Sequence, residues 1–167
     1  MGRRVICGRV AVILAGIVIM GFLHGEGRAG TGINLVKGQT VYVPTYSFIY
    51  CGDRARKLNV TTTLSIRNTD VSNPIRIVSV KYHNSTGTLV RDYLKDAAEL
   101  GPLSSTQFLV GESDLSGGAA PSFIVRWESA KEVNEPLIEA IMIGCASNQG
   151  ISLVCPARVI AVDGSAP

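Results

Sequence analysis

Histidine is nearly absent from this chain of 167 residues: there are two, and His24 lies in an N-terminal segment unlike the rest, which leaves His83 for the folded part. Zinc sites take three or four ligands from Cys, His and acidic residues at recognisable spacing, and no such set surrounds His83. A Ser-His-Asp or Cys-His site would have to use His83, and no G-x-S-x-G stretch marks a nucleophile. The sequence therefore predicts no metal site, no catalytic residues and a protein that is not an enzyme.

The N-terminal segment has the layout of an export signal. Three arginines in the first nine residues precede the uncharged run 10–23, an order of positive and apolar regions typical of secretory signals. As a helix this run would reach about 21 Å, short of a hydrocarbon core about 30 Å thick. The longer run 5–23 is long enough to span a membrane, but Arg9 interrupts it. We expect an exported, periplasmic or otherwise extracytoplasmic protein, either cleaved after Ala29 or anchored by residues 5–23.

This leader sets the expected domain organisation: 1–29 signal peptide or anchor, 30–36 linker, 37–162 folded domain and 163–167 tail. Removing residues 1–29 takes away four of the 16 basic and one of the 13 acidic residues, which leaves twelve of each. A formal net charge of zero gives no support to nucleic-acid binding. Membrane contact is expected only through the N-terminal segment, if it is uncleaved.

One glycine pattern imitates a cofactor site. The stretch "GEGRAG" at 25–30 matches the G-x-G-x-x-G fingerprint of dinucleotide-binding turns. That fingerprint requires a preceding strand and a following helix. Here the preceding run has the flanks of a signal, and another glycine follows. We therefore expect no cofactor.

The sequence after the leader has the pattern of β-strands. Segments rich in β-branched and aromatic residues alternate with turn residues, which predicts an all-β domain. In 57–68, one face of the strand is apolar and expected to be buried: Leu58, Val60, Thr62, Leu64 and Ile66. Phe123, Val125 and Trp127 alternate in the same way, and we expect Trp127 in the core. The fold class predicted is an antiparallel β-sandwich, immunoglobulin-like, with about seven or eight strands.

Two of these segments carry local irregularities. Pro44, inside the opening segment 39–50, suggests an edge strand or a bulge, because proline donates no ladder hydrogen bond. Segment 75–83 changes the parity of its apolar residues midway. That change indicates a bulge or a strand buried on both faces.

Cys145 and Cys155 flank "SNQG", which reads as a hairpin turn. With a three-residue loop both cysteines lie on the buried face but about 13 Å apart along the strands. With a two-residue turn they point to opposite faces. Either register excludes a bond between them, since disulfides need Cα atoms within about 7 Å. Exported chains do form disulfides, so the possible pairing is Cys51 with Cys145 or Cys155.

Two polar turns are candidates for contact with a partner. "RNTD" supplies Arg67, Asn68 and Asp70 after the clearest strand, and "SNQG" places Asn148 and Gln149 at a hairpin tip. Recognition in a sandwich falls to loops at one end, and side-chain amides both donate and accept hydrogen bonds. The alternative is that turns require these residue types for backbone reasons and that no partner touches them.

Several stretches occur in an order that resembles a known bacterial family: "GQTVYVPTYSFIY", "LSIRNTD", "LGPLSSTQFLV", "SGGAAPSFIVRWES", "EAIMIG" and "QGISLV". The family is domain of unknown function 3124, and the resemblance covers about residues 37–160. It implies a small exported or lipid-anchored protein and carries no activity to transfer. The cysteines at 51, 145 and 155 depart from the family pattern, which weakens any shared disulfide or thiol role.

The leader, the strand pattern and the missing catalytic constellation together favour a non-enzymatic exported protein that binds or scaffolds another cell-envelope component, an unknown protein or ligand. A small-ligand or carbohydrate-binding module is the alternative, which exposed aromatics on a sheet face would favour. A hydrolase built from carboxylates is less favoured.

Export is directly testable. We expect a reporter that lacks its own signal, fused after residue 36, to become active outside the cytoplasm, because residues 1–29 supply the signal. Retention of the reporter inside the cell would contradict the localisation. Mass spectrometry of the mature N-terminus would distinguish cleavage near Ala29 from an anchor.

Overall fold

The computed structural model describes residues 34–146 and 149–162, which form twelve strands. Their bounds are β1 Leu35–Pro44, β2 Phe48–Cys51, β3 Arg56–Asn59, β4 Thr61–Arg67, β5 Ile75–His83, β6 Leu89–Asp92, β7 Ala98–Leu100, β8 Ser105–Val110, β9 Ser122–Asn134, β10 Leu137–Ala146, β11 Gln149–Pro156 and β12 Arg158–Val162. Within these ranges no helix is long and apolar enough to cross a membrane. The expected leader lies outside the described residues.

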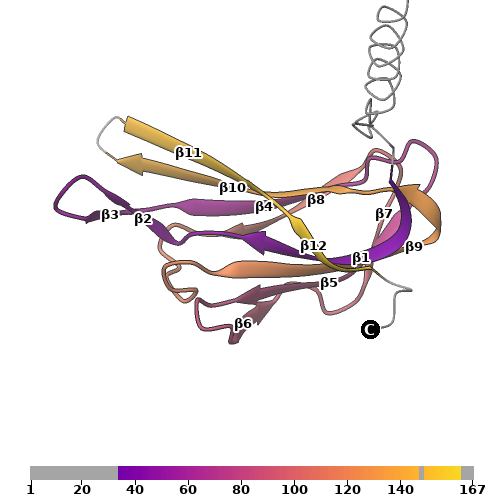
Figure 1. The fold of residues 1–167 in the computed structure, drawn as a ribbon, viewed down its shortest axis with the longest axis horizontal. Coiled ribbons are helices and arrows are strands. Elements are labelled where there is room, and N and C mark those ends of the chain that lie inside the picture. The colour runs from indigo at the N-terminus through magenta and orange to yellow at the C-terminus, as the bar shows by residue number, and fades with distance from the viewer. Residues whose placement is uncertain (1–33, 147–148, 163–167) are drawn as a thin grey trace, which may run out of the picture. The chain divides into compact units, whose positions relative to one another are not determined.

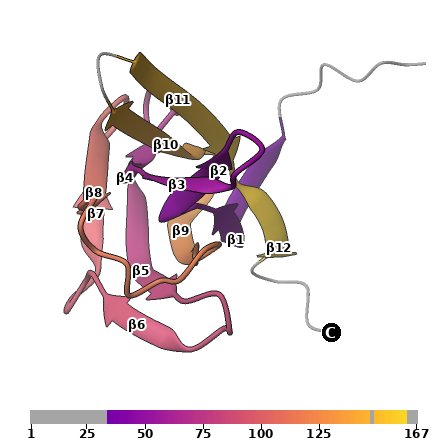
Figure 2. The same cartoon turned by 90° about the vertical axis from the view of Figure 1, so that its left-hand side faces the viewer.

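The strands form two main sheets and a hairpin, and all the pairings are antiparallel. One sheet has six strands in the order β12-β1-β9-β5-β6, with β7 also paired to β5; the other has four in the order β11-β10-β4-β8. In Figure 2 the six-stranded sheet runs from β12 on the right to β6 at the lower left. The β2–β3 hairpin extends at the same end as the tip of the β10–β11 hairpin (Figure 1). The predicted all-β sandwich is confirmed.

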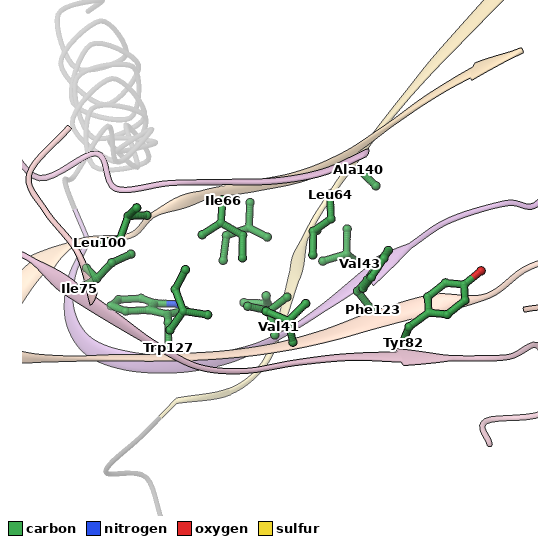
Figure 3. Packing of buried hydrophobic residues seen from close by; sticks show 14 of the residues in the cluster. Val41, Val43, Leu64, Ile66, Ile75, Tyr82, Leu100, Phe123, Trp127 and Ala140 are labelled. Atoms are coloured by element: carbon green, nitrogen blue, oxygen red, sulfur yellow. The ribbon is translucent and has the colours of Figure 1, made fainter. Parts of the chain in front are cut away.

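The core lies between the two sheets. Leu64, Ile66 and Ala140 from the four-stranded sheet face Val41, Phe123 and Trp127 from the six-stranded sheet (Figure 3). These side chains are at most 3% exposed, and Trp127 is fully buried, as its alternation predicted. Close burial of this kind is the dominant stabilising contribution in such a fold.

There are more strands than expected because three expected segments divide. Segment 39–50 gives β1 and β2, 57–68 gives β3 and β4, and 151–162 gives β11 and β12. In addition a short strand, β7, forms in a segment where no strand was expected. The last division is a change of sheet: β11 pairs with β10, β12 pairs with β1, and between them Ala157 N donates to Ile138 O at 2.9 Å.

Pro44 does not mark an edge strand, so that expectation is wrong. β1 lies between β12 and β9, and Pro44 is its last residue, paired with Ser122. The next residue, Thr45, donates its N–H to Pro121 O at 3.0 Å, outside the ladder. A proline is compatible with an interior strand at this position because the ladder ends there.

The parity change in 75–83 is a bulge. The register of β5 against β9 shifts between Ile77 and Ser79. Ile75 and Ile77 before the shift, and Val80 and Tyr82 after it, are all at most 1% exposed. One extra residue thus keeps both halves of the strand facing the core.

A matched pair of leucines tests the sandwich. We expect Leu64→Ala to lower the free energy of unfolding by about 2–5 kcal/mol, because its side chain is fully buried and its removal leaves a cavity. Leu109→Ala on the neighbouring strand β8 is the control. It is 59% exposed, and we expect an effect within about 0.5 kcal/mol. Equal losses in urea unfolding would contradict the assignment of faces.

Candidate functional site

The structure buries two of the five residues that the sequence offered for partner contact. Asn68 is 2% exposed and Asp70 is 7% exposed. Both lie just after β4, in the loop that leads to β5. Side chains this deeply buried offer little surface to a partner, which favours the alternative interpretation, that the turn itself requires Asn68 and Asp70.

Asn68 joins two loops. Its Nδ2 lies 2.9 Å from Asn73 O, 2.9 Å from Gly101 O and 3.2 Å from Leu100 O, and its Oδ1 accepts from Asp70 N at 3.0 Å. Its backbone N–H donates to Ser104 O at 2.9 Å. The amide therefore fixes the turn after β4 against the chain that follows β7.

Asp70 joins that turn to β9. Its Oδ1 accepts from the backbone N–H groups of Ser72 at 2.9 Å and Asn73 at 2.8 Å, and its Oδ2 accepts from Asn134 N at 3.3 Å. The bond from Ser72, followed by that from Asn73, is the main reason that the pKa of Asp70 lies below its ordinary value of 3.8. The carboxylate thus acts as an ionised acceptor inside the loop.

The other predicted contact residues lie elsewhere. Arg67 is exposed at the end of β4, where its Nε donates to Ser65 Oγ at 3.2 Å. Asn148 and the side chain of Gln149 lie outside the described residues. Arg67 pairs with Leu137, whereas Gln149 pairs with Ala146 at the opposite end of β10, about 30 Å away at the usual rise per residue. The two predicted loops therefore do not form one site.

Cys51, Cys145 and Cys155 are free thiols, so the expected disulfide is not formed. The hairpin has the two-residue turn, with Ala146 opposite Gln149, and Cys145 and Cys155 point to opposite faces. Cys155 pairs with Ala140, which also pairs with Leu64, whereas Cys51 pairs with Arg56. Arg56 and Leu64 are eight residues apart along β3 and β4, which corresponds to a distance on the order of 25 Å. Cys51 and Cys155 are therefore far too distant to form a disulfide.

Cys145 points away from Cys51. The preceding residue, Gly144, faces the β3–β4 junction so closely that a Cβ there would lie 3.0 Å from Asn59 O and 3.1 Å from Val60 Cγ1. Alternation along β10 sends the Cys145 side chain to the other face, where it is exposed. The three-residue register had placed Ile143 and Cys145 on the buried face; with the two-residue turn both are exposed.

A groove of about 900 Å³ lies on the outer face of the six-stranded sheet. Its lining comes from the loop before β5, from β5 and β7, and from the neighbouring strands β1 and β9: Lys37, Ser72, Asn73, Pro74, Ile75, Arg76, Glu99, Arg126, Glu128, Ser129, Ala130 and Lys131. On β9, Arg126 and Glu128 alternate with the fully buried Val125 and Trp127, which places them on the solvent side of the sheet.

The groove results from an irregularity between β1 and β9. Val36 pairs with Val133, but Gly38 pairs with Glu128, so residues 129–132 of β9 stand opposite the single residue Lys37. Figure 1 shows β1 and β9 bending together at this end of the sheet. Ser129 ties the insertion to the neighbouring loop, because its Oγ donates to Pro74 O at 3.0 Å.

Charges of both signs line the groove, with an excess of basic residues. Arg76 has a glutamate as cross-strand neighbour on each side, Glu128 on β9 and Glu99 on β7. Its Nη1 lies 3.4 Å from Glu128 Oε1. The remaining basic residues of the lining are Lys37, Arg126 and Lys131.

Sequence reasoning missed this groove. Its lining is assembled from four separate stretches of chain, around residues 37, 72–76, 99 and 126–131, and the polar segment "SAKEVN" interrupts the alternation that predicts a strand. The structure continues β9 through that segment to Asn134. The available signal was a short polar insertion inside an otherwise alternating strand, which is the mark of a bulge, and bulges are common beside functional sites.

Other kinds of site find little support among the residues that the structure describes. No three His, Cys, Asp or Glu side chains gather there as metal ligands. Tyr42, Tyr46 and Tyr50 are 38–60% exposed, which the sequence had not indicated, but none of them lines the groove.

The fold and the groove define a class, an all-β sandwich protein with an open, charged groove on one sheet. Residues 38–160 match the family described as "Protein of unknown function (DUF3124)", and the chain belongs to this family. The solved structure described as "Crystal Structure of Thermotoga maritima 1070" is similar over 78% of this chain and 99% of that chain, with 12% identity and a TM-score of 0.45. Comparison with curated proteins finds no match.

The role of Asp70 can be tested by its pH dependence. A depressed folded-state pKa means that the carboxylate stabilises the fold fully above its unfolded value, near 3.8, and that this contribution is lost as the pH falls through the lower folded-state value. We expect Asp70→Asn to lower the Tm by several degrees at pH 7, because an NH2 group would then face backbone N–H donors.

The difference in Tm between wild type and this variant should shrink as the pH falls below 3.8. Asp96→Asn, in an exposed loop between β6 and β7, is the control and should leave the Tm unchanged at both pH values. A Tm difference between wild type and Asp70→Asn that is the same at all pH values would contradict the role given to the Asp70 carboxylate.

Proposed function

We propose that this protein is exported to the cell envelope and binds another envelope component through the groove on its six-stranded sheet. The observation that carries the proposal is the groove itself, which is large and open and is lined by charged side chains on paired strands. Its volume of about 900 Å³ falls within the range of about 300–1,000 Å³ usual for ligand sites. The proposal of export rests on the leader sequence.

Binding is favoured over catalysis by the arrangement of the two glutamates. A carboxylate-based hydrolase needs two carboxyl groups with the scissile bond between them. Glu99 and Glu128 do lie on opposite sides of one strand, but that strand places Arg76 between them. The guanidinium therefore occupies the position that the substrate would require, and we propose a protein without hydrolytic activity.

The groove is also better placed for contact with a partner than the two loops that the sequence predicted. Asn68 and Asp70 support one wall of it, because their bonds fix Ser72 and Asn73, which line it. They contribute to binding through the wall and not by touching the ligand. The hairpin-tip residues Asn148 and Gln149 remain a rival contact surface, which the following experiment separates from the groove.

Blocking the groove should reduce recovery of the partner. We expect Ala130→Trp, which adds a large side chain at an exposed lining position, to reduce recovery of the component that the wild-type protein captures from envelope extract. Ala119→Trp, at an exposed position in the loop before β9, should leave recovery unchanged and controls for added apolar surface. Both variants should keep the wild-type Tm within a few degrees.

The double variant Asn148→Ala, Gln149→Ala should also leave recovery unchanged. If that variant loses the component while Ala130→Trp retains it, the contact lies at the hairpin tip and the groove assignment is wrong. Failure of the wild-type protein to capture any component, together with turnover in a panel of hydrolase substrates, would overturn the binding function itself.

A further inference from the structure

Two lysines from neighbouring strands line the groove where the register of β1 and β9 is interrupted. Lys37 is the single β1 residue between Val36 and Gly38, and Lys131 belongs to the four residues of β9 that stand opposite it. Both side chains are exposed and both line the groove. The irregularity that forms the groove therefore also brings two ammonium groups to it.

These ammonium groups are not neutralised by the described part of the chain. No ion pair of Lys37 or Lys131 occurs there. Glu128 instead lies 3.4 Å from Arg76, and Glu99 is the other neighbour of Arg76. A third carboxylate near β1, that of Glu135, accepts from Asn34 Nδ2 at 2.7 Å and Gln39 Nε2 at 2.5 Å. Of the nearby acids, Glu128 and Glu135 thus have other partners.

Glu132, beside Lys131 in the sequence, is not among the lining residues. Because Arg76 balances one of the two lining glutamates, the lysines leave a local excess of positive charge. Such a concavity attracts anions, and the attraction weakens as salt is added.

Neutral hydrogen-bond donors complete the lining next to the lysines. The hydroxyl of Ser72 and the amide of Asn73 border the groove. Asp70 holds this wall through the N–H groups of Ser72 and Asn73, and Ser129 is held to Pro74. The wall is therefore ordered before a ligand arrives, which reduces the entropy that binding must overcome.

Resting on the binding function proposed above, we infer that the groove takes a ligand bearing a phosphoryl group, held between Lys37 and Lys131. Ammonium groups from two separate strands can each contact a different oxygen of one tetrahedral anion, and the Ser72 hydroxyl can donate to a third. A planar carboxylate is better matched by the paired donors of an arginine. Of the two lining arginines, Arg76 is engaged with Glu128, and Arg126 also has a partner within the chain. A soluble phosphate monoester and a phospholipid headgroup share this chemistry.

The test uses the full-length protein with defined probes. Calorimetry would measure binding of glycerol 3-phosphate against glycerol and against glutarate. Co-sedimentation would measure binding to phosphatidylcholine vesicles with and without phosphatidylglycerol. We expect phosphoryl-dependent binding that weakens with salt, and an affinity at least about tenfold lower in the double variant Lys37→Gln, Lys131→Gln, because two charge-assisted contacts are lost.

The matched control is Lys57→Gln with Lys95→Gln, which removes the same charge at exposed positions outside the groove and should change the affinity less than twofold. The single variant Lys37→Gln serves if the double variant unfolds.

Binding of glycerol 3-phosphate assigns a soluble ligand. Binding to anionic vesicles, with no binding of glycerol 3-phosphate, assigns a phospholipid headgroup. Equal affinity for glutarate, or undiminished binding by the double variant, would overturn the inference. Loss of extract recovery in Ala130→Trp, with no phosphoryl-dependent binding by wild type, would overturn the ligand class alone.

Discussion

The side chains of Asn68 and Asp70 hold one end of the sandwich together. The turn that carries them leaves the four-stranded sheet after β4. Their partners include Leu100 and Gly101 at the end of β7, and Asn134 at the end of β9, both in the six-stranded sheet. Buried polar groups are tolerated when each finds a partner, and here the partners are backbone groups at strand ends and in loops. The same bonds fix the loop that forms a wall of the groove, so fold and site share one set of contacts.

The register break between β1 and β9 is the second constraint on the site. A long loop at this point would place its charged residues on a flexible segment. Instead β9 remains paired with β1 on both sides of the insertion, through Val133 before Lys37 and through Glu128 after it. An insertion of this kind increases the local twist and redirects side chains, and it places Lys131 near a lysine of the facing strand without disturbing Val125 and Trp127 in the core.

Much of the fold could be predicted from alternation, and the reasons for the failures are local. Leu64 and Trp127 are buried as expected because a two-residue period assigns a face without knowledge of the partner strand. The hairpin register depended on whether the turn has two or three residues, which composition does not decide. The division of 151–162 at Pro156 required knowledge that β11 and β12 pair with different sheets.

The candidate site was harder to predict than the fold. Asn and Asp in a turn have the same composition whether they face a partner or the interior, and only burial separates the two cases. For Asn68 and Asp70 it favours the interior. The lining of the groove is contributed by stretches that are far apart in sequence, so no local sequence motif indicates the groove. Its charges appeared in the sequence only as ordinary solvent-facing residues of alternating strands.

The placement of the lysines on paired strands has an energetic consequence for recognition. Ordering a free loop on binding costs about 1–2 kcal/mol of backbone entropy for each residue fixed. On β1 and β9 that cost has already been met by folding, and a ligand must immobilise only the lysine side chains, at about 0.5–1.5 kcal/mol each. A charge-assisted hydrogen bond contributes about 1.5–3 kcal/mol, so each lysine contact is favourable after this cost. This low ordering cost is the physical reason to place recognition on the paired strands of the groove.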